Sequence, residues 1–328
     1  MRILTGLLAV IVLLAPVALL SDYHLFQCTL VLSYAMALLG LNLVMGYGGQ
    51  ISLGHGAFYA VGGYTTAILM DKGGVPYWAT LPVSAALCAA MGFLVGWPAL
   101  RLRGPYLALV TLALAAAVPQ ILKHRALERW TGGVQGIVLT KPEAPFGVPL
   151  SEDGWLYLFA LAVAAAAFLL VRNLVRGRAG RAIIAVRDHA LAAEAMGVNV
   201  ASLKTRTFAL SATLTGVAGS VGAMAVAFVS PDSFTAFLSI TLFVGAVVGG
   251  AASLAGAVAG AVFIVLVPAL AGHLSKAAPG AAYGAILILC LYAMPGGVAG
   301  LVQGGLKRVR RATGPSLVTS ARRTRDAA

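Results

Sequence analysis

Long apolar runs separated by short polar turns dominate this sequence. A transmembrane helix needs roughly 20 apolar residues, and we predict about ten such helices. They lie at 3–20, 25–46, 51–70, 77–100, 104–122, 155–171, 207–229, 238–252, 254–270 and 281–303. Soluble domains carry about 25% charged residues, whereas this chain of 328 residues carries 10% and is 60% hydrophobic. The sequence therefore predicts an all-α integral membrane protein, because lipid removes the need to hide so much apolar surface.

Two parts of this pattern allow a second interpretation. The first run could be a cleaved signal peptide, since Arg2 precedes it. However, Pro16 to Ser21 offers no convincing small-residue cleavage motif, which favours a retained helix. The runs at 238–252 and 254–270 are short and nearly continuous, so they could form one broken element.

Lys and Arg predict the orientation. The segment 172–206 carries seven of them against Asp188 and Glu194, and the tail from Lys307 to Arg325 carries seven more. Basic loops stay in the cytoplasm, so ten spans place both of these segments and both termini there. The net charge of +13 is thus a topology signal, and we expect no nucleic-acid partner. We divide the chain into a membrane domain, 1–306, and a basic tail, 307–328, that we expect to be disordered or at the lipid surface.

Several common sources of energy and chemistry are missing. The chain has no GxxxxGK[ST] phosphate loop and no HExxH motif. No Asp or Glu lies in the middle of a predicted span, whereas proton- or sodium-coupled carriers usually bury such carboxylates. If the protein moves a solute uphill, we expect the energy to enter from a partner. A secondary carrier or a channel without an ATPase stays as the alternative, and scattered histidines do not suggest an enzyme.

A glycine-rich segment joins the second and third spans. It runs from Gly40 to Phe58 and places polar side chains among glycines, namely Asn42, Gln50, Ser52 and His55. Broken helices near the membrane midplane expose backbone groups that can bind a solute. The segment therefore predicts that these four residues lie near a solute route. A tight interhelical turn with polar side chains at the membrane surface is the simpler alternative.

The segment 180–199 is longer than a turn between adjacent spans requires. Asp188 can cap a helix, residues 189–196 favour helix, and Gly197 can end it with a positive φ. We expect a short cytoplasmic helix presented to a partner, with an ordinary surface helix as the alternative. A further segment begins with Arg101 and Arg103, which can anchor at lipid phosphates, and Pro105 suits the first turn of the helix that follows.

These segments carry a resemblance to a known family. The strings GLNLVMGYGGQISLGHGAFYAVGGY, RLRGPYLALVTLAL, TGGVQGI and GRAIIAVRDHALAAEAMGVNVASLKTRTFALSATLTGVAGSVGA all resemble the LivM-type permease of branched-chain amino-acid ABC transporters. The similarity covers roughly 40–300 and is carried most specifically by the last string. It implies the membrane fold of ABC importers and a location in the bacterial plasma (inner) membrane.

The resemblance also implies partners and roles. Such a permease pairs with a second, homologous permease, two cytoplasmic ATP-binding subunits and an extracytoplasmic solute-binding protein. ATP and Mg²⁺ would be bound by the partners, so we expect no cofactor and no catalysis in this chain. The loop 172–206 resembles the coupling helix that docks on the ATPase, and its residues in that role are Arg187, Asp188, Glu194, Ala195 and Gly197. The implied solute is a branched-chain amino acid, with urea, short amides or other amino acids as alternatives.

A faint internal repeat adds to this pattern. Residues 48–53 resemble residues 249–254, and both join a descending and a rising span. Parallel repeats around a central pathway are common in transporters, although chance similarity between glycine-rich segments explains the match equally well.

Overall fold

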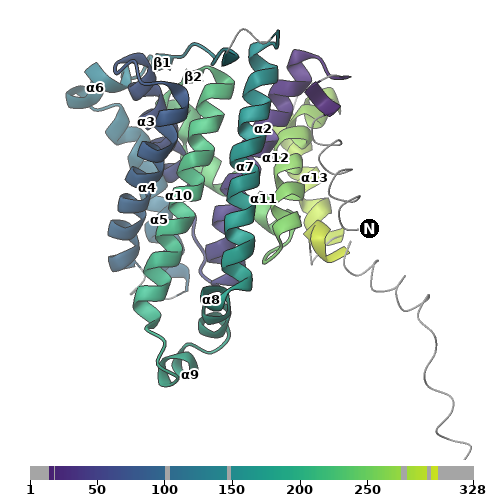
Figure 1. The fold of residues 1–328 in the computed structure, drawn as a ribbon. Coiled ribbons are helices and arrows are strands. Elements are labelled where there is room, and N and C mark those ends of the chain that lie inside the picture. The colour runs from purple at the N-terminus through teal and green to yellow at the C-terminus, as the bar shows by residue number, and fades with distance from the viewer. Residues whose placement is uncertain are drawn as a thin grey trace, which may run out of the picture.

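The computed structural model describes residues 15–17, 19–99, 104–145, 149–274, 279–293 and 297–301. Its helices form a bundle whose long members run along one common direction (Figure 1). They are α2 (Asp22–Asn42) with its π-helical extension η1 (Leu43–Tyr47), α3 (His55–Asp71), α4 (Tyr77–Ala99), α5 (Pro105–Leu122), α7 (Glu152–Arg176), α10 (Val200–Val226), α11 (Ala236–Gly249), α12 (Leu254–Leu274) and α13 (Pro279–Ala293).

Short elements lie at both ends of the bundle. At one end, which we call the far end, are α6 (Arg125–Thr131), β1 (Ile137–Val138), β2 (Phe228–Val229) and the 3-10 turn η3 (Pro231–Phe234). At the other end, α8 (Arg178–Asp188) and α9 (Ala190–Ala195) project beyond the long helices. We call residues 177–199 the arm, and this end of the bundle the arm end.

The multi-pass prediction is confirmed, and the exact count stays a prediction. In the described part of the chain, six helices are long and apolar enough to cross a membrane. α11 is apolar but has 14 residues, which at about 1.5 Å per residue is shorter than a bilayer core of about 30 Å. The predicted first span lies mostly outside the described residues, and Arg101, Arg103 and the tail 307–328 lie wholly outside them.

The runs at 238–252 and 254–270 form two separate helices rather than one broken element. α11 and α12 are joined by the turn at 250–253 and pack against each other. Their contact is made by glycines, because a Cβ on Gly249 would lie 2.0 Å from the Gly256 carbonyl oxygen, and one on Gly260 would lie 2.1 Å from the Gly245 carbonyl oxygen. Small residues let the backbones of membrane helices approach closely, so the pairs Gly245/Gly249 and Gly256/Gly260, each four positions apart, serve packing here.

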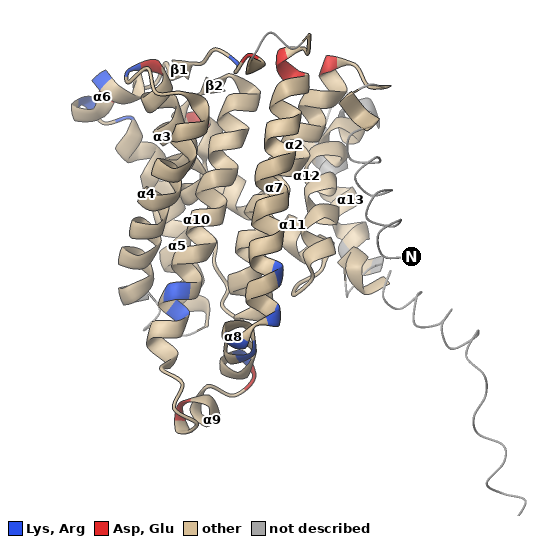
Figure 2. Ribbon diagram, viewed as in Figure 1, with Lys and Arg blue, Asp and Glu red and all other residues tan. Residues whose placement is uncertain are grey.

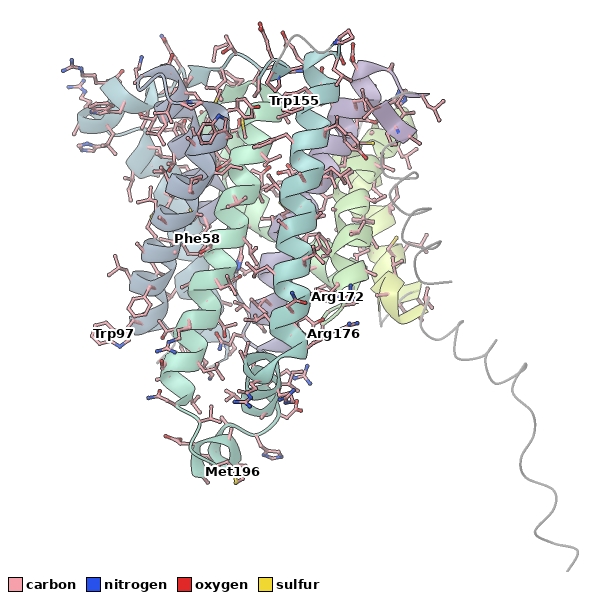
Figure 3. All side chains as sticks on the ribbon, in the orientation of Figure 1. Phe58, Trp97, Trp155, Arg172, Arg176 and Met196 are labelled. Atoms are coloured by element: carbon pink, nitrogen blue, oxygen red, sulfur yellow. The ribbon has the colours of Figure 1, made fainter. Side chains whose placement is uncertain are left out.

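α10 is the central helix of the bundle and contacts α2, α3, α4 and α7. Its approach to α3 is again backbone against backbone, since a Cβ on Gly219 would lie 2.0 Å from the Tyr59 carbonyl oxygen. Beside this crossing, the rings of Phe58 and Phe208 meet edge to face with centroids 5.8 Å apart (Figure 3 labels Phe58). α10 thus carries the core that positions the other helices.

Charge separates the two ends of the bundle (Figure 2). At the arm end, most of the charged residues that the structure describes are basic. The last turns of α7 contribute two of them, Arg172 and Arg176 (Figure 3). The acidic residues of the described chain lie at the far end, apart from Asp188 and Glu194 on the arm. The orientation of the arm end toward the cytoplasm rests on these basic residues and stays a prediction.

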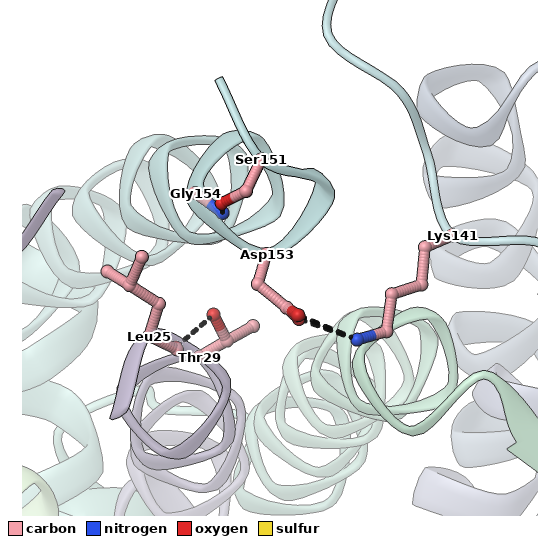
Figure 4. Close-up of polar contacts among 6 residues, drawn as sticks. All are labelled: Leu25, Thr29, Lys141, Ser151, Asp153 and Gly154. Carbon is pink, nitrogen blue, oxygen red and sulfur yellow. Dashed lines mark hydrogen bonds and ion pairs between the residues drawn. The ribbon is translucent and has the colours of Figure 1, made fainter. Parts of the chain in front are cut away.

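The far end is folded and closed by polar contacts. β1 and β2 pair antiparallel, with Ile137 opposite Val229. Lys141 donates to both carboxylate oxygens of Asp153 at 2.7 and 2.9 Å, and the hydroxyl of Ser151 accepts from the Gly154 amide at the start of α7 (Figure 4). In the described residues 123–145 and 149–153, these contacts and α6 form a structured cover over the bundle, which we call the outer cover.

Candidate functional site

Residues 43–54 form the predicted break between two helices. α2 widens into the π-helical turn η1, where the Gly48 amide donates to the Leu43 carbonyl at 3.1 Å. Gly49 then takes a φ of +66°, a left-handed conformation that favours glycine. From there the chain runs irregularly to the start of α3 at His55. We call residues 43–54 the first glycine turn and residues 250–253 the second glycine turn.

Asn42 ties the two glycine turns together. Its side chain is 2% exposed. The Nδ2 group donates to the Ser253 carbonyl at 2.8 Å, and Oδ1 accepts from the Ala252 amide at 2.7 Å. The amide thus bonds on both sides to one turn that lies 210 positions away in sequence. Asn42, the last residue of α2, therefore holds the second glycine turn against the start of the first.

Ser52 and His55 belong to a buried polar chain, and each is 1% exposed. The Ser211 hydroxyl of α10 donates to the Gly40 carbonyl at 2.5 Å, so its oxygen accepts from His55 Nε2 at 2.7 Å. Nδ1 of the neutral ring is then the acceptor for the Ser52 hydroxyl at 3.1 Å. Through this chain His55 connects the ends of α2 and α3 to the middle of α10.

The backbone amides just before and at the start of α3 also find hydrogen-bond partners inside the protein. The Leu53 amide donates to the Thr111 hydroxyl of α5, and the Gly56 amide donates to the Ser239 hydroxyl of α11, both at 2.9 Å. Helix starts leave such donors without partners in their own helix, and lipid supplies none. Side chains of α5 and α11 therefore bond the amide groups that would otherwise be open to a solute at this point.

Gln50 has a different environment from Asn42, Ser52 and His55. It lines a cleft of about 750 Å³ between the first glycine turn and the arm. Its Oε1 atom is buried without a hydrogen-bond partner among the described residues. The cleft is also lined by charged residues of the arm and of α10, namely Arg187, Asp188, Glu194 and Lys204. Gln50 is therefore the member of the predicted set that lines the cleft and also has a buried polar atom without a partner among the described residues.

Arg187 connects the arm to the bundle. Its Nε donates to Asp188 Oδ1 at 2.9 Å, and its Nη1 donates to the Gly46 carbonyl in the first glycine turn at 3.0 Å. The predicted capping role of Asp188 is wrong, because Asp188 is the last residue of α8 and its carboxylate pairs with Arg187. α8 is itself held against the bundle by the buried side chains of Ile183 and Val186.

The tip of the arm is exposed to solvent. Gly197 has a φ of +87°, and the Val198 amide donates to the Ala193 carbonyl, which ends α9 as the sequence predicted. Glu194, Ala195 and Gly197 are all exposed. Two apolar side chains beside them are also bare, Leu191 at 81% and Met196 at 85% exposed (Figure 3 labels Met196 at the tip).

The predicted residues fall into two groups. Asn42, Ser52 and His55 are buried and bonded inside the bundle, whereas Gln50 lies in the cleft beside the arm residues. Sequence reasoning missed the partners of these buried groups and of the nearby amides, which are Thr111, Ser211, Ser239, Ala252 and Ser253. The internal repeat could have drawn attention to Ser253. A lone Ser or Thr in an apolar helix gives no such signal, because most such hydroxyls bond a carbonyl of their own helix.

Comparisons with known proteins give the family. The family described as "Branched-chain amino acid transport system / permease component" matches residues 24–295. The high-affinity branched-chain amino acid transport system permease protein LivM of Escherichia coli K12 is 35% identical over 261 residues, which cover 73% of this chain and 61% of that protein. This chain therefore spans about three fifths of the length of LivM.

Two further relatives are more distant in sequence. The permease protein LivH of Escherichia coli K12 is 25% identical over 292 residues, covering 83% of this chain and 92% of LivH. The autoinducer 2 import system permease protein LsrC of Shigella flexneri is 26% identical over 279 residues, covering 80% and 77%. Because the family match spans most of the chain, this protein belongs to the permease components of branched-chain amino acid transport systems.

Proposed function

We propose that this chain is the transmembrane permease subunit of an ATP-binding cassette importer, and that it carries a branched-chain amino acid or a related small solute. The relatives LivM and LivH are permease proteins of a branched-chain amino acid transport system. The relative LsrC belongs to an autoinducer 2 import system. The solute class of this chain therefore depends on its own partners, with urea and short amides as the other candidates.

The observation that carries the proposal is the arm. A helix pair projects beyond the bundle at its basic end, and its tip leaves Glu194, Leu191 and Met196 open to solvent. Apolar side chains gathered beside charged residues on an exposed tip form a patch of the kind that marks a protein contact. A partner that grips this tip could move α8, whose Arg187 is bonded to the first glycine turn. The arm is thus suited to receive force from an ATPase.

The proposal includes the partners and the orientation. A second, homologous permease would complete the pathway, two cytoplasmic ATP-binding subunits would hydrolyse ATP, and a solute-binding protein would deliver the solute at the far end. The arm end and both termini would face the cytoplasm of a bacterial inner membrane. The basic character of the arm end supports this orientation.

We also propose that Asn42, Gln50, Ser52 and His55 lie near the solute route. The contacts support two different roles within this set. Asn42, Ser52 and His55 hold the shape of the glycine turns through buried bonds, whereas Gln50 lines the cleft and has an unpaired side-chain oxygen among the described residues. Solute contact is therefore most strongly supported for Gln50.

The first experiment asks what binds the chain. The tagged protein would be purified in mild detergent from its native membrane, and its partners would be identified by mass spectrometry. We expect an ATP-binding subunit and a second permease, after which the binding protein made with them would be screened for leucine, isoleucine, valine and urea. Isolation of the chain alone, under conditions that preserve known transporters, would instead favour a carrier or a channel.

The second experiment tests the tip of the arm. Glu194→Lys should release or uncouple the ATP-binding subunit while the protein stays in the membrane, because it reverses a charge at the proposed contact. Glu143→Lys is the matched control, since Glu143 is an exposed acid of the outer cover and the charge change is the same. Equal transport in the two variants would show that the tip has no role in coupling.

The third experiment tests the route. Alanine at each of Asn42, Gln50, Ser52 and His55 should lower transport without loss of the ATP-binding subunit. We expect Gln50→Ala to leave the thermal stability unchanged, whereas the other three variants should also lower it, because their partners become unsatisfied. Normal uptake in all four variants would remove them from the pathway.

A further inference from the structure

The end of the α2–η1 helix is bonded to a residue of the arm. The amides of Gly48, Gly49 and Gln50 donate to earlier carbonyls, those of Leu43, Met45 and Val44. The Gly46 carbonyl accepts instead from Arg187 Nη1 at 3.0 Å, across 141 positions of sequence. A guanidinium at the C-terminal end of a helix is favourable, because it satisfies a carbonyl and complements the helix dipole.

The aliphatic part of the Arg187 side chain also contacts the first glycine turn. A Cβ on Gly49 would lie 2.6 Å from Arg187 Cγ, so the side chain crosses directly over the left-handed glycine. The Arg187 side chain is one third exposed and lines the cleft between the arm and the turn. Arg187 therefore touches the first glycine turn at two places, one polar and one apolar.

The other side of Gly46 contacts the second glycine turn. A Cβ on Gly46 would lie 2.2 Å from the Ala252 amide nitrogen and 2.1 Å from Asn42 Oδ1. Asn42 in turn bonds Ala252 and Ser253. Contacts therefore run without interruption from the arm, through Arg187 and Gly46, to the turn that joins α11 and α12.

The second turn is under backbone strain. Ala252 has a φ of +57° and Gly250 has a φ of +108°. A non-glycine residue in the left-handed region costs about 1 kcal/mol or more, and it persists when its surroundings hold it there. The bond from the Ala252 amide to Asn42 is such a constraint. Release of this contact would let the turn relax to another conformation, which is the property that a gate needs.

We infer that Arg187 is the positioning residue through which the arm moves both glycine turns, so that displacement of α8 reaches η1 by the Arg187–Gly46 bond and the α11–α12 turn by Asn42. The inference rests on the proposed function, because an ATPase must supply the displacement. It adds to that function the path by which force enters the membrane part. The path ends at the second glycine turn, which the sequence did not assign to the site.

Transport and ATP hydrolysis test this link in the assembled complex. Arg187→Ala should lower the solute uptake per ATP hydrolysed at least tenfold, measured on complexes that are matched for the amount of bound ATP-binding subunit. Arg187→Lys should restore part of the uptake, since an ammonium can still donate to the Gly46 carbonyl. Arg181→Ala is the matched control, because Arg181 lies on the same helix and bonds the Arg176 carbonyl instead of the glycine turn. Equal coupling in the Arg187 and Arg181 alanine variants would overturn the inference.

A second pair of variants moves Arg187 without removing it. Gly49→Ala places a methyl group against the Arg187 stem, whereas Gly74→Ala meets nothing within 4 Å. Both glycines are left-handed, with φ of +66° and +59°, so the backbone strain is matched. We expect Gly49→Ala alone to reduce the uptake per ATP. If Gly74→Ala reduces it equally, the strain and not Arg187 is responsible.

Hydrogen–deuterium exchange separates the link from the proposed function. The chain alone, in lipid nanodiscs, would be compared as wild type, Arg187→Ala and Arg181→Ala. Loss of a hydrogen bond to a charged group should raise exchange in peptides covering 43–54 and 250–254 roughly tenfold, only in the Arg187 variant. Equal exchange in both variants would refute the link and leave the proposed function standing. A wild-type chain that binds no ATPase would refute the proposed function, whatever the exchange shows.

Discussion

The crossing of α3 and α10 gives the sharpest test of how this bundle is packed. A Cβ on Gly62 would lie 1.9 Å from the Gly216 carbonyl oxygen of α10. To reach an ordinary contact of 3.4 Å, one of the two backbones must move by about 1.5 Å. α10 packs against α2, α3 and α4 at once, so it has no free direction in which to move. Gly62→Ala should therefore overpack the core and destabilise the protein by about 1–3 kcal/mol or more.

Its neighbour Gly63 is the matched control for this substitution. Both glycines are buried in α3, and both gain the same helix propensity, about 1 kcal/mol, when changed to alanine. A Cβ on Gly63 would meet its nearest atom at 3.3 Å, which needs only a small adjustment. The assay measures, by size-exclusion chromatography, the fraction of protein that stays monodisperse after heating. This fraction should fall at a temperature several degrees lower for Gly62→Ala than for Gly63→Ala. Equal thermal stability of the two variants would refute the close crossing.

Three further predictions concern polar contacts. Ser211→Ala should lower the stability by about 2 kcal/mol, because it leaves two buried partners without a hydrogen bond. Thr213→Ala should lower it little, since that hydroxyl bonds only its own helix. Heating assays would compare the two variants, and equal losses would contradict the buried chain. Trp155→Phe should lower stability by about 1 kcal/mol in the same assay, through loss of the indole N–H bond to a tyrosine hydroxyl of α4. Lys141→Glu should destabilise the outer cover, and adding Asp153→Lys should restore its stability. Both effects should be smaller in high salt. A double variant that is no more stable than the single variant would rule out this ion pair.

The elements that could be predicted are those set by local composition. Runs of apolar residues located α4 and α5 to within a residue, whereas α7 and α10 extend beyond the predicted spans 155–171 and 207–229 at their starts. Trp78 and Trp97 lie near the two ends of α4 and are 61% and 62% exposed, as is typical of aromatic residues at membrane surfaces. Pro105 opens α5, and Gly197 ends α9. Each of these depends on the preferences of a residue and its nearest neighbours, so no knowledge of the fold was needed.

Predictions that depended on distant partners were less complete. Asp188 was expected to cap a helix, but its carboxylate pairs with Arg187, whose guanidinium also reaches Gly46. The π-helical turn at 43–47 was not predicted; at this turn Gly46 lies against Ala252, and Asn42 bonds the backbone of residues 252 and 253. The projection of α8 and α9 was expected, whereas the cleft that they form with Gln50 depends on how the arm folds back.

The sequence by itself determined that this protein crosses a membrane many times, which end is basic, and to which family it belongs. These properties follow from hydropathy, from the positions of Lys and Arg, and from local strings such as those around Gly49 and Glu194. The tertiary structure alone decided that Asn42 joins the two glycine turns, that Ser211 completes the His55 chain, and that Arg187 connects the arm to Gly46. The physical reason is that lipid offers no hydrogen bonds, so each break in a helix must find its partners on other helices, at positions that sequence distance does not reveal.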